Sequence, residues 1–293
     1  MNSADSWPAP AKLNLFLHIT GRKDDGYHLL QTLFQFIDYG DELYFSVRDD
    51  GLVSRISGAD SIPEHNDLTF RAAKLLQQAT DCKKGVDIRI RKNLPLGGGL
   101  GGGSSDAATT LVALNHLWGL ELPQETLLDL AMSLGADVPV FVFGQSAWAE
   151  GIGEKLTACD LPTPWFVVVH PGVQVSTAEL FAAPELTRDV LPIKIRDYFD
   201  RGGENVFEPL VRQRYPEVNK ALNWLSQQEN LLQPARMTGT GSCVFAPFES
   251  EAHARHVVEK LNLEMPGPWK AWCARGCRES PLMSRLKSLE ALV

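Results

Sequence analysis

The chain has 293 residues, 44% of them hydrophobic and 22% charged, so it is long enough to bury one large core or two of average size. Its formal net charge is -8, and an acidic protein lacks the general attraction to nucleic acid and anionic lipid that a basic protein has. Neither nucleic acid nor a membrane is therefore an expected partner. The five cysteines are odd in number and form no Cys-x-x-Cys pair, which argues against a disulfide framework and a zinc site.

The N-terminal segment does not have the pattern of an export signal. It carries Asp5 and the sequence Trp-Pro-Ala-Pro at residues 7–10, where a signal would need a basic cluster and an apolar run. The longest apolar runs, such as residues 138–143 and 166–169, are far shorter than the roughly 20 residues that cross a bilayer. We therefore expect a cytoplasmic protein.

The first third of the chain reads as strands and one helix. Residues 11–19 are apolar and strand-like, and alternation over residues 42–48 and 52–56, on either side of a tight Asp-Asp-Gly turn, predicts a hairpin. Apolar positions at helical spacing predict a helix over residues 67–78, and strict alternation predicts a strand over residues 86–90.

A glycine-rich segment and two helices follow. The helix that we expect over residues 106–118 ends at Gly119, and the next one spans residues 124–134. Around residues 161–164 the prolines and the loss of periodicity indicate a domain boundary. The sequence therefore predicts one domain over residues 1–160 and a second over residues 161–293.

The second domain alternates between strands and helices. A strand over residues 165–170 precedes a helix-rich region at residues 193–228 and a strand, turn and strand at residues 236–248. A helix over residues 250–261 and a strand over residues 270–274 follow. This order predicts a split β-α-β domain, and the fold class of the whole chain is α+β.

Residues 97–103 contain six glycines, interrupted only by Leu100. Each would cost roughly 0.5 to 1 kcal/mol inside a helix or strand, so the segment must need bare backbone. Glycine lets several N–H groups converge on one anion, and a helix that begins at Ser104 or Ser105 adds its own unpaired N–H groups and dipole. We predict a polyphosphate ligand here. The two serines are also favoured N-cap residues, so capping alone and a phosphate or metal contact remain alternatives.

The glycine segment does not match a Walker A loop, because no Lys-Ser or Lys-Thr follows its last glycine. Residues 94–108, Leu-Pro-Leu-Gly-Gly-Gly-Leu-Gly-Gly-Gly-Ser-Ser-Asp-Ala-Ala, instead resemble the phosphate loop of the GHMP kinases, in the form typical of the diphosphocytidyl-methylerythritol kinases. Residues 9–15 and 237–243 resemble the first and third motifs of the same superfamily, and the resemblance extends from residue 8 to residue 274.

This resemblance implies a two-domain GHMP kinase fold. The N-terminal domain, residues 1–160, would be a β-α-β domain like that of ribosomal protein S5 and would bind the nucleotide, and residues 161–293 would form a ferredoxin-like split β-α-β domain. The implied activity is ATP-dependent phosphorylation of the 2-hydroxyl of 4-diphosphocytidyl-2-C-methyl-D-erythritol, a step of non-mevalonate isoprenoid biosynthesis. The implied ligands are ATP, Mg²⁺ and this CDP-linked sugar alcohol.

Two residues are candidates for catalysis. Asp137 matches the position of the carboxylate base, although an aspartate before Val-Pro is also a common helix N-cap. Lys12 stands in an apolar, strand-like stretch, where a charge is unexpected without a partner, and Asp137 is the plausible one. The resemblance implies that Lys12 orients the base and the acceptor hydroxyl; the alternative is a lysine in solvent at the end of a strand.

The resemblance also assigns two groups of binding residues. ATP would be bound by Pro95, Leu96, Gly97, Gly98, Gly99, Leu100, Gly101, Gly102, Gly103, Ser104, Ser105, Asn66 and Asp67. The acceptor would be bound by Asn14, Tyr27, His28, Thr177, Phe181, Thr238, Gly239, Thr240 and Gly241, with Tyr27 stacked on the cytosine and His28 hydrogen-bonded to its edge. No side chain is assigned as a metal ligand, and Mg²⁺ would be held mainly by phosphate oxygens and Ser105.

Two other functions remain open at this stage. Another GHMP kinase, acting on homoserine, mevalonate or a sugar, would keep Lys12 and the glycine loop but would need no cytosine pocket. A non-catalytic nucleotide-binding or RNA-binding module would share the β-α-β topology, although the acidic net charge argues against RNA. The residues Tyr27, His28 and Phe181 discriminate between the first alternative and the diphosphocytidyl substrate.

Overall fold

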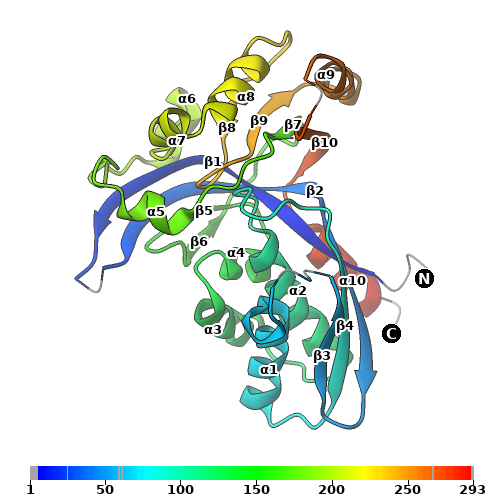
Figure 1. The fold of residues 1–293 in the computed structure, drawn as a ribbon. Coiled ribbons are helices and arrows are strands. Elements are labelled where there is room, and N and C mark those ends of the chain that lie inside the picture. The colour runs from blue at the N-terminus through cyan, green and yellow to red at the C-terminus, as the bar shows by residue number, and fades with distance from the viewer. Residues whose placement is uncertain (1–5, 25, 59, 61, 266, 292–293) are drawn as a thin grey trace.

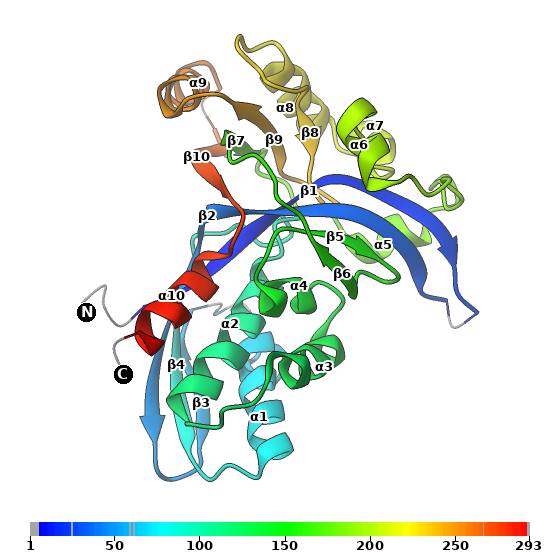
Figure 2. The same cartoon turned by 180° about the vertical axis from the view of Figure 1, so that it is seen from behind.

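A long antiparallel ribbon runs through the whole molecule (Figures 1 and 2). The computed structural model describes residues 6–24, 26–58, 60, 62–265 and 267–291. Strands β1, Trp7–Arg22, and β2, His28–Arg48, pair from Trp7 opposite Leu43 to Arg22 opposite His28. The strand-like stretch that the sequence predicts is part of β1. The ribbon is so long that its far end packs against the C-terminal half, where Leu17 and Ile19 belong to the second core.

The N-terminal half completes its sheet with a parallel pair. β3, Val53–Ser57, pairs in parallel with β4, Gly85–Arg91, and β4 pairs with β2, so the strand order is β3-β4-β2. The predicted hairpin is therefore wrong, because β4 lies between the two strands that it would have joined. Helix α1, Leu68–Thr80, makes the crossover connection that a parallel pair requires. Alternation identified β3 as a strand but carried no information about its partner.

Helices cover one face of this sheet. They are α1, α2 (Gly102–Leu117), α3 (Gln124–Leu134) and α4 (Val138–Phe143). Their buried apolar residues, among them Leu111 and Phe141, form one core with Phe36, Leu43 and Ile88 of the strands. The helices predicted from periodicity are confirmed, although α2 begins earlier than expected. Two short strands, β5 (Ala147–Glu150) and β6 (Lys155–Ala158), extend the sheet along the same edge of β2 as β4, with β5 paired to β2 over Thr32 to Phe34.

The C-terminal half has its own core and continues the same sheet. Its strands are β7 (Trp165–His170), β8 (Arg236–Met237), β9 (Val244–Phe248) and β10 (Lys270–Cys277), in the order β10-β7-β9-β8. Its helices are α5 (Thr177–Ala182), α6 (Ile195–Arg201), α7 (Glu208–Arg214), α8 (Pro216–Ser226) and α9 (Glu251–Glu264). The elements predicted for this region are confirmed.

Strand β10 joins the two halves. It pairs with β7 over Lys270 to Arg275 and then with β2 through Gly276 and Cys277. A further helix that the sequence did not predict, α10, Pro281–Glu290, follows and returns to the N-terminal half, where Leu282 is fully buried in the first core. The result is the mixed α+β architecture that the sequence predicts.

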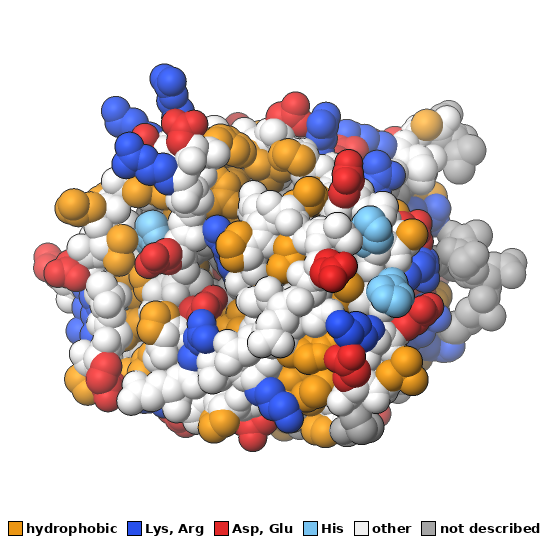
Figure 3. All heavy atoms as spheres, turned by 90° about the horizontal axis from the view of Figure 1, so that it is seen from above, with side chains coloured by type: hydrophobic (Ala, Val, Ile, Leu, Met, Phe, Trp, Pro, Cys, Tyr) orange, Lys and Arg blue, Asp and Glu red, His pale blue; other side chains and the backbone are white. Residues whose placement is uncertain are grey.

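The surface agrees with the acidic composition. On the face seen in Figure 3, which looks down on the C-terminal half, lysines and arginines are interspersed with acidic side chains, and hydrophobic side chains form several separate groups. Among the described residues, no helix combines the length and the apolar character that a membrane span needs.

Candidate active site

A cavity of about 450 Å³ lies where the glycine segment meets the β1–β2 ribbon. Both halves of the chain contribute to it. Its walls include residues 95–104 from the loop, Lys12, Asn14, Thr32 and Phe34 from the ribbon, Ala136 and Asp137 before α4, Thr177 and Phe181 of α5, and Gly239, Thr240 and Gly241. A volume of this size is in the range of small-molecule sites.

The glycine loop is held by backbone contacts that leave no room for side chains. Gly99 has a φ of 75°, and a Cβ at this residue would lie 2.2 Å from the carbonyl oxygen of Thr238. Gly101 has a φ of 73°, and a Cβ there would lie 2.7 Å from the Phe141 ring and 3.2 Å from Cε of Lys12. The loop therefore packs directly against both the catalytic lysine candidate and the Thr238 turn, which only glycine permits.

Helix α2 begins at Gly102, with Gly101 as its N-cap, so the sequence-based start at Ser104 or Ser105 is wrong. The reason is that the left-handed backbone of Gly101 already turns the chain into the helix. Neither serine is an N-cap, and the alternative of capping alone is excluded. Ser104 lines the cavity, whereas Ser105 is buried and its Oγ has no hydrogen-bond partner among the described residues.

Lys12 and Asp137 meet in this cavity. Lys12 is 3% exposed, and its Nζ lies 3.3 Å from Oδ2 of Asp137 and donates a 2.5 Å hydrogen bond to Oδ1 of Asn14. Nζ also lies 5.4 Å from the centroid of the Phe34 ring. Lys12 and Asn14 are two residues apart on β1 and so point to the same side of the strand. The ammonium is thus fixed by three neighbours, and the interpretation of Lys12 as a lysine in solvent is wrong.

Asp137 occupies the N-cap position of α4, but its side chain makes no capping hydrogen bond. The carboxylate is 41% exposed and faces the cavity instead. Pro139 in the first turn of α4 has no N–H group, which reduces the number of donors that a cap would have to satisfy. The carboxylate is therefore available to accept a proton from a ligand.

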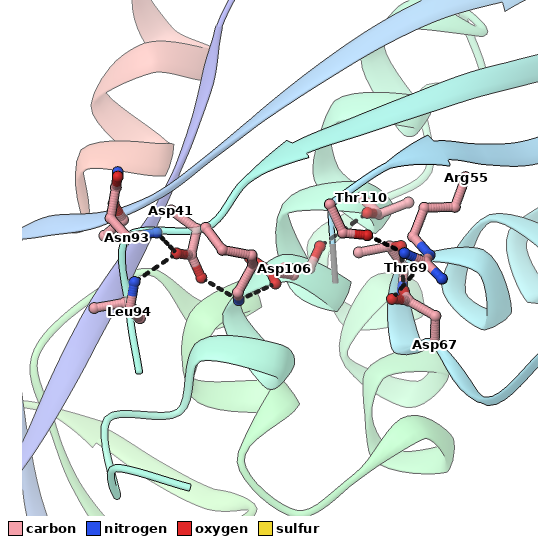
Figure 4. A network of polar contacts seen from close by, with 11 residues as sticks. Asp41, Arg55, Asp67, Thr69, Asn93, Leu94, Asp106 and Thr110 are labelled. Atoms are coloured by element: carbon pink, nitrogen blue, oxygen red, sulfur yellow. Dashed lines mark hydrogen bonds and ion pairs between the residues drawn. The ribbon is translucent and has the colours of Figure 1, made fainter. Parts of the chain in front are cut away.

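A buried polar network fixes both ends of the glycine loop (Figure 4). Oδ1 of Asp41 accepts hydrogen bonds from the backbone N–H groups of Asn93, at 2.6 Å, and Leu94, at 2.8 Å. Nζ of Lys92 pairs with Asp41 and, at 2.8 Å, with Oδ2 of Asp106, the fifth residue of α2. Burial raises the pKa of Asp106 to about 7 against the opposing effect of the Lys92 ammonium.

The other end of the cavity opens toward a second hollow of about 530 Å³, and the two share Leu30, Ala136 and Phe181. Tyr27, which is 61% exposed, and His28 line this hollow. The rings of His28 and Phe181 lie 4.9 Å apart, with 33° between their planes. The three aromatic side chains of the predicted base pocket are therefore close together, although they come from the β1–β2 connection and from α5.

His28 is placed to donate a hydrogen bond to a ligand. Its Nε2 accepts one from Nε of Arg188 at 3.2 Å, so in the neutral ring the proton is on Nδ1. Burial lowers the pKa of His28, and the charges of Arg188 and Arg22 lower it further. The imidazole is thus kept neutral with one N–H group free to be donated.

Residues of the third motif, 237–243, form hydrogen bonds with α5, with β1 and with the glycine loop. Oγ1 of Thr177 on α5 lies 2.7 Å from Oγ1 of Thr240. The hydroxyl of Thr238 accepts a 2.9 Å hydrogen bond from the backbone N–H of Asn14 and donates to the carbonyl oxygen of Gly99. Thr238 is fully buried and does not line the cavity, so its assignment as a substrate contact stays a prediction without support from the cavity lining; it holds β1 against the glycine loop.

Comparison with known proteins agrees with this geometry. Residues 67–145 match the model of the GHMP kinases N terminal domain, and residues 193–267 match that of the GHMP kinases C terminal. A 4-diphosphocytidyl-2-C-methyl-D-erythritol kinase from Nitrosococcus oceani is 56% identical over 281 residues, which cover 96% of this chain and 98% of the relative. The chain belongs to this family of GHMP kinases.

Further members of the family agree. The Alkalilimnicola ehrlichii kinase of the same name is 55% identical over 98% of this chain and 96% of its own length. A crystal structure of a 4-(cytidine 5'-diphospho)-2C-methyl-D-erythritol kinase is 36% identical, with a TM-score of 0.77, over 92% of this chain and 98% of that one. The resemblance that the three motifs predicted is confirmed, as is the two-domain GHMP kinase fold. A homoserine kinase from Cytophaga hutchinsonii, 19% identical with a TM-score of 0.66 over 95% of this chain and 97% of that one, shares the fold.

Three nucleotide contacts predicted from the family pattern, Ser105, Asn66 and Asp67, do not line the cavity. Asn66 ends a short 3-10 helix, Glu64–Asn66. Its side chain is exposed and is not part of the cavity wall. Asp67 is the N-cap of α1, where it accepts a hydrogen bond from the Thr69 N–H and pairs with Arg55 at 3.3 Å. Its carboxylate is thus already used by the helix and by Arg55. Leu68, one residue further, is the side chain of this segment that reaches the cavity.

Sequence reasoning also missed residues of the site. Lys92 lines the cavity beside the glycine loop, and Leu17, Leu30 and Phe207 form its apolar end. The charge of Lys92, two residues before the loop begins at Leu94, was a signal that could have been used. Nothing in the local sequence distinguishes the three apolar residues from core residues, because contacts between the two halves of the chain bring them together.

The residues present fit a metal ion that is carried by the nucleotide rather than held in a protein cage. The described part of the chain has no group of three or more His, Cys, Asp or Glu side chains that could hold a metal ion. Mg²⁺ in nucleotide sites keeps several waters and is bound through phosphates and one or two side chains. The unpartnered Oγ of Ser105 and the exposed carboxylate of Asp137 are the oxygens available on either side of the phosphate loop.

Proposed function

We propose that this chain transfers the γ-phosphoryl group of ATP to the 2-hydroxyl of 4-diphosphocytidyl-2-C-methyl-D-erythritol, in isoprenoid biosynthesis. The new bond joins the γ-phosphorus to the hydroxyl oxygen, the bond to the β,γ-bridging oxygen breaks, and ADP leaves. The observation that carries this proposal is the pairing of Lys12 with Asp137 beside the glycine loop, in a chain 56% identical to a kinase of that name.

Phosphoryl transfer depends mainly on positioning and on stabilising charge. Asp137 accepts the proton of the attacking hydroxyl, because its carboxylate caps no helix and faces the cavity. Lys12 holds that carboxylate at 3.3 Å and places a positive charge beside the transferring group. Asn14 fixes the lysine from the other side through its 2.5 Å hydrogen bond.

The triphosphate binds over residues 97–105. The first turn of α2 has backbone N–H groups without partners inside the helix, and these groups and the positive end of the helix dipole attract an anion. The Asp41–Lys92–Asp106 network supports this position, since it fixes the loop where it leaves β4 and where it enters α2. Mg²⁺ would supply charge neutralisation when bound with ATP, and Ser105 is the side chain that would assist the phosphates in holding it.

The cytidine end of the acceptor binds between Tyr27, His28 and Phe181. An exposed aromatic ring offers a stacking surface to a base, and the Nδ1–H of neutral His28 matches an acceptor on the cytosine edge. Thr177 and Thr240, whose hydroxyls lie 2.7 Å apart at the cavity wall, contact the sugar or diphosphate between the base and the reacting hydroxyl.

Two further parts of the proposal concern the chain as a whole. The chain has an N-terminal domain, residues 1–160, and a C-terminal domain, residues 161–293. Residues from both domains contribute to the binding of ATP and of the acceptor. We also propose that the enzyme acts in the cytoplasm, where ATP is available.

A phosphotransfer assay tests the reaction. Wild-type enzyme is given ATP, Mg²⁺ and, in separate reactions, CDP-methylerythritol, homoserine or mevalonate, and the phosphorylated product is identified by mass spectrometry. We expect preferential consumption of CDP-methylerythritol. Equal or faster turnover of homoserine or mevalonate would show that the acceptor is wrong although the enzyme is a GHMP kinase. ATP binding without phosphorylation of any alcohol would favour the non-catalytic module.

A further inference from the structure

A cavity of about 390 Å³, distinct from the active-site cavity and from the hollow beside Tyr27, lies on the opposite face of the β1–β2 ribbon. It shares no lining residue with the site described above. Leu15 of β1 and Gln35 of β2 line it, whereas their neighbours Asn14 and Phe34 line the active-site cavity, as expected for the two faces of a strand. Figure 2, seen from behind, shows the connection between β6 and β7 and helix α6 on this side of the ribbon.

The walls of this cavity are mostly aromatic, proline and leucine side chains. Phe166 and Phe245 are buried beneath it, and Tyr198 and Phe199 of α6 form one side. Phe199 and Leu232 are each 53% exposed, although large apolar side chains are usually covered. They stand where a ligand with an apolar body would cover them.

The polar groups of the cavity are positive or neutral. Arg201 lines it and makes no ion pair or hydrogen bond with any residue that the structure describes. Arg236 uses Nη1 to donate to the carbonyl oxygens of Leu15, at 2.9 Å, and Gly203, at 2.7 Å, which leaves Nε and Nη2 without a hydrogen bond to a described residue. The Tyr198 hydroxyl has no hydrogen-bond partner in the described chain either.

No aspartate or glutamate is among the described residues that line the cavity. In a chain with a net charge of -8, an apolar cavity with two arginines and no acidic side chain is selective for negative charge. Arginine beside an apolar wall can bind the acidic group of a molecule while the wall buries the rest.

We infer that this cavity is a second ligand site, separate from the kinase site, for a small organic anion with an aromatic or branched apolar body and a single carboxylate or phosphate group. Arg201 and the free donors of Arg236 bind the acidic group. The apolar body lies on Phe166 and Phe245 and is covered by Phe199 and Leu232.

Calorimetric titration of the full chain with 1-naphthoate tests this inference. Saturating ADP and cytidine 5'-diphosphate are present throughout, so that the kinase site is occupied. We expect one equivalent of naphthoate to bind with a Kd of about 1 mM or tighter, in line with the ligand efficiency of small ligands. The neutral analogue 1-naphthalenemethanol keeps the ring but not the charge. Its Kd should be at least about fivefold higher than that of naphthoate.

Matched variants locate the site. Arg201→Gln should weaken naphthoate binding about fivefold or more, whereas Arg196→Gln, on the same helix but outside the cavity, should leave it within about twofold. Phe199→Ala should weaken it as well, and Leu263→Ala, which truncates a still more exposed side chain on α9, should not. All four side chains are on the surface, so the fold should survive each change.

Several results would overturn the inference. They are the absence of binding in the presence of the two nucleotides, equal binding of the neutral analogue, or equal effects of the two arginine variants. A second copy of the chain could instead cover the apolar mouth. Sedimentation would reveal this as a wild-type dimer that Phe199→Ala converts to a monomer, and that result would also count against a ligand site.

Discussion

The two ends of the active-site cavity are built in different ways. At the phosphate end, Gly99 and Gly101 touch Thr238 and Lys12 with no space for a Cβ, and the buried Asp41 fixes where the loop begins. At the base end, Tyr27 is 61% exposed and lies beside an open hollow of about 530 Å³. The phosphate end is preformed by backbone packing, whereas the base end consists of side chains that a ligand has to complete.

This difference separates chemistry from specificity. Lys12, Asp137 and the glycine loop line the phosphate end, whereas Tyr27 and His28 line the hollow at the base end. Substitutions at the phosphate end should therefore reduce kcat or destroy nucleotide binding. Substitutions at the base end should change KM for the acceptor and leave kcat and stability almost unchanged.

Asp137→Asn should have the largest effect. Loss of the proton acceptor should reduce kcat by about a thousandfold, the middle of the range for general base catalysis, with KM for ATP almost unchanged. Its side chain caps no helix but pairs with the buried Lys12, so thermal stability should be slightly lower than that of Asp129→Asn, an exposed change on α3 with full activity. Steady-state kinetics and thermal melts measure both. Unchanged kcat would show that Asp137 is not the base.

Gly99→Ala tests whether the phosphate end is fixed by close packing. Its Cβ would lie 2.2 Å from the Thr238 carbonyl, so the loop must move, and kcat/KM for ATP should fall about a hundredfold. Gly119→Ala is the matched control, since Gly119 has a similar φ of 69° and nothing within 4 Å of the added Cβ. It should cost about 1 kcal/mol of stability from backbone strain and leave the kinetics intact. Equal kinetic loss in both variants would contradict the packing argument.

Tyr27→Ala addresses the base end. Loss of a stacking surface should raise KM for CDP-methylerythritol about tenfold, while kcat and KM for ATP stay the same. Tyr27→Phe keeps the ring and should stay within about twofold of wild type. A fall in kcat without a change in KM would mean that Tyr27 belongs to the chemical step, and the contrast between the two ends would then fail.

The smallest expected effect concerns the titration of His28. Burial and the charges of Arg188 and Arg22 lower its pKa below the ordinary 6.5, so the ring stays neutral in the folded protein until the pH falls below that value. The unfolded chain binds the proton first, and stability is therefore lost as the pH falls from about 6.5 through the folded pKa. Nuclear magnetic resonance titration should show the pKa of His28 rising in Arg188→Gln but not in Arg214→Gln, whose side chain pairs with Glu185.

The same contrast explains what could be predicted from the sequence. The phosphate loop needs bare backbone at consecutive positions, so its glycines are visible as a run, and the charge of Lys12 is conspicuous in an apolar strand. The contacts of Asp67 and Thr238 could not be predicted because their partners, Arg55 and Gly99, are distant in sequence. The local sequence pattern indicates which type of side chain a position needs. It does not indicate whether a residue distant in sequence already forms a hydrogen bond or an ion pair with that side chain.

Strand pairing was predicted less well than strand position. Alternation located β3 correctly and misassigned its partner, since a tight turn and two alternating runs fit both a hairpin and a crossover through α1. The full length of β2, His28–Arg48, was also missed, because it passes from one half of the molecule into the other and changes neighbours along the way. The division at residue 160 remains a prediction.

Helix α10 has a consequence for how the protein is made. Leu282 is fully buried in the N-terminal core, although about 130 residues separate it from the end of β5 in sequence. While the ribosome is still synthesising the C-terminal half, the first core therefore has an apolar gap at its edge. The N-terminal half can collapse during synthesis, but it reaches its final packing only after the last segment of the chain has emerged and folded back onto it.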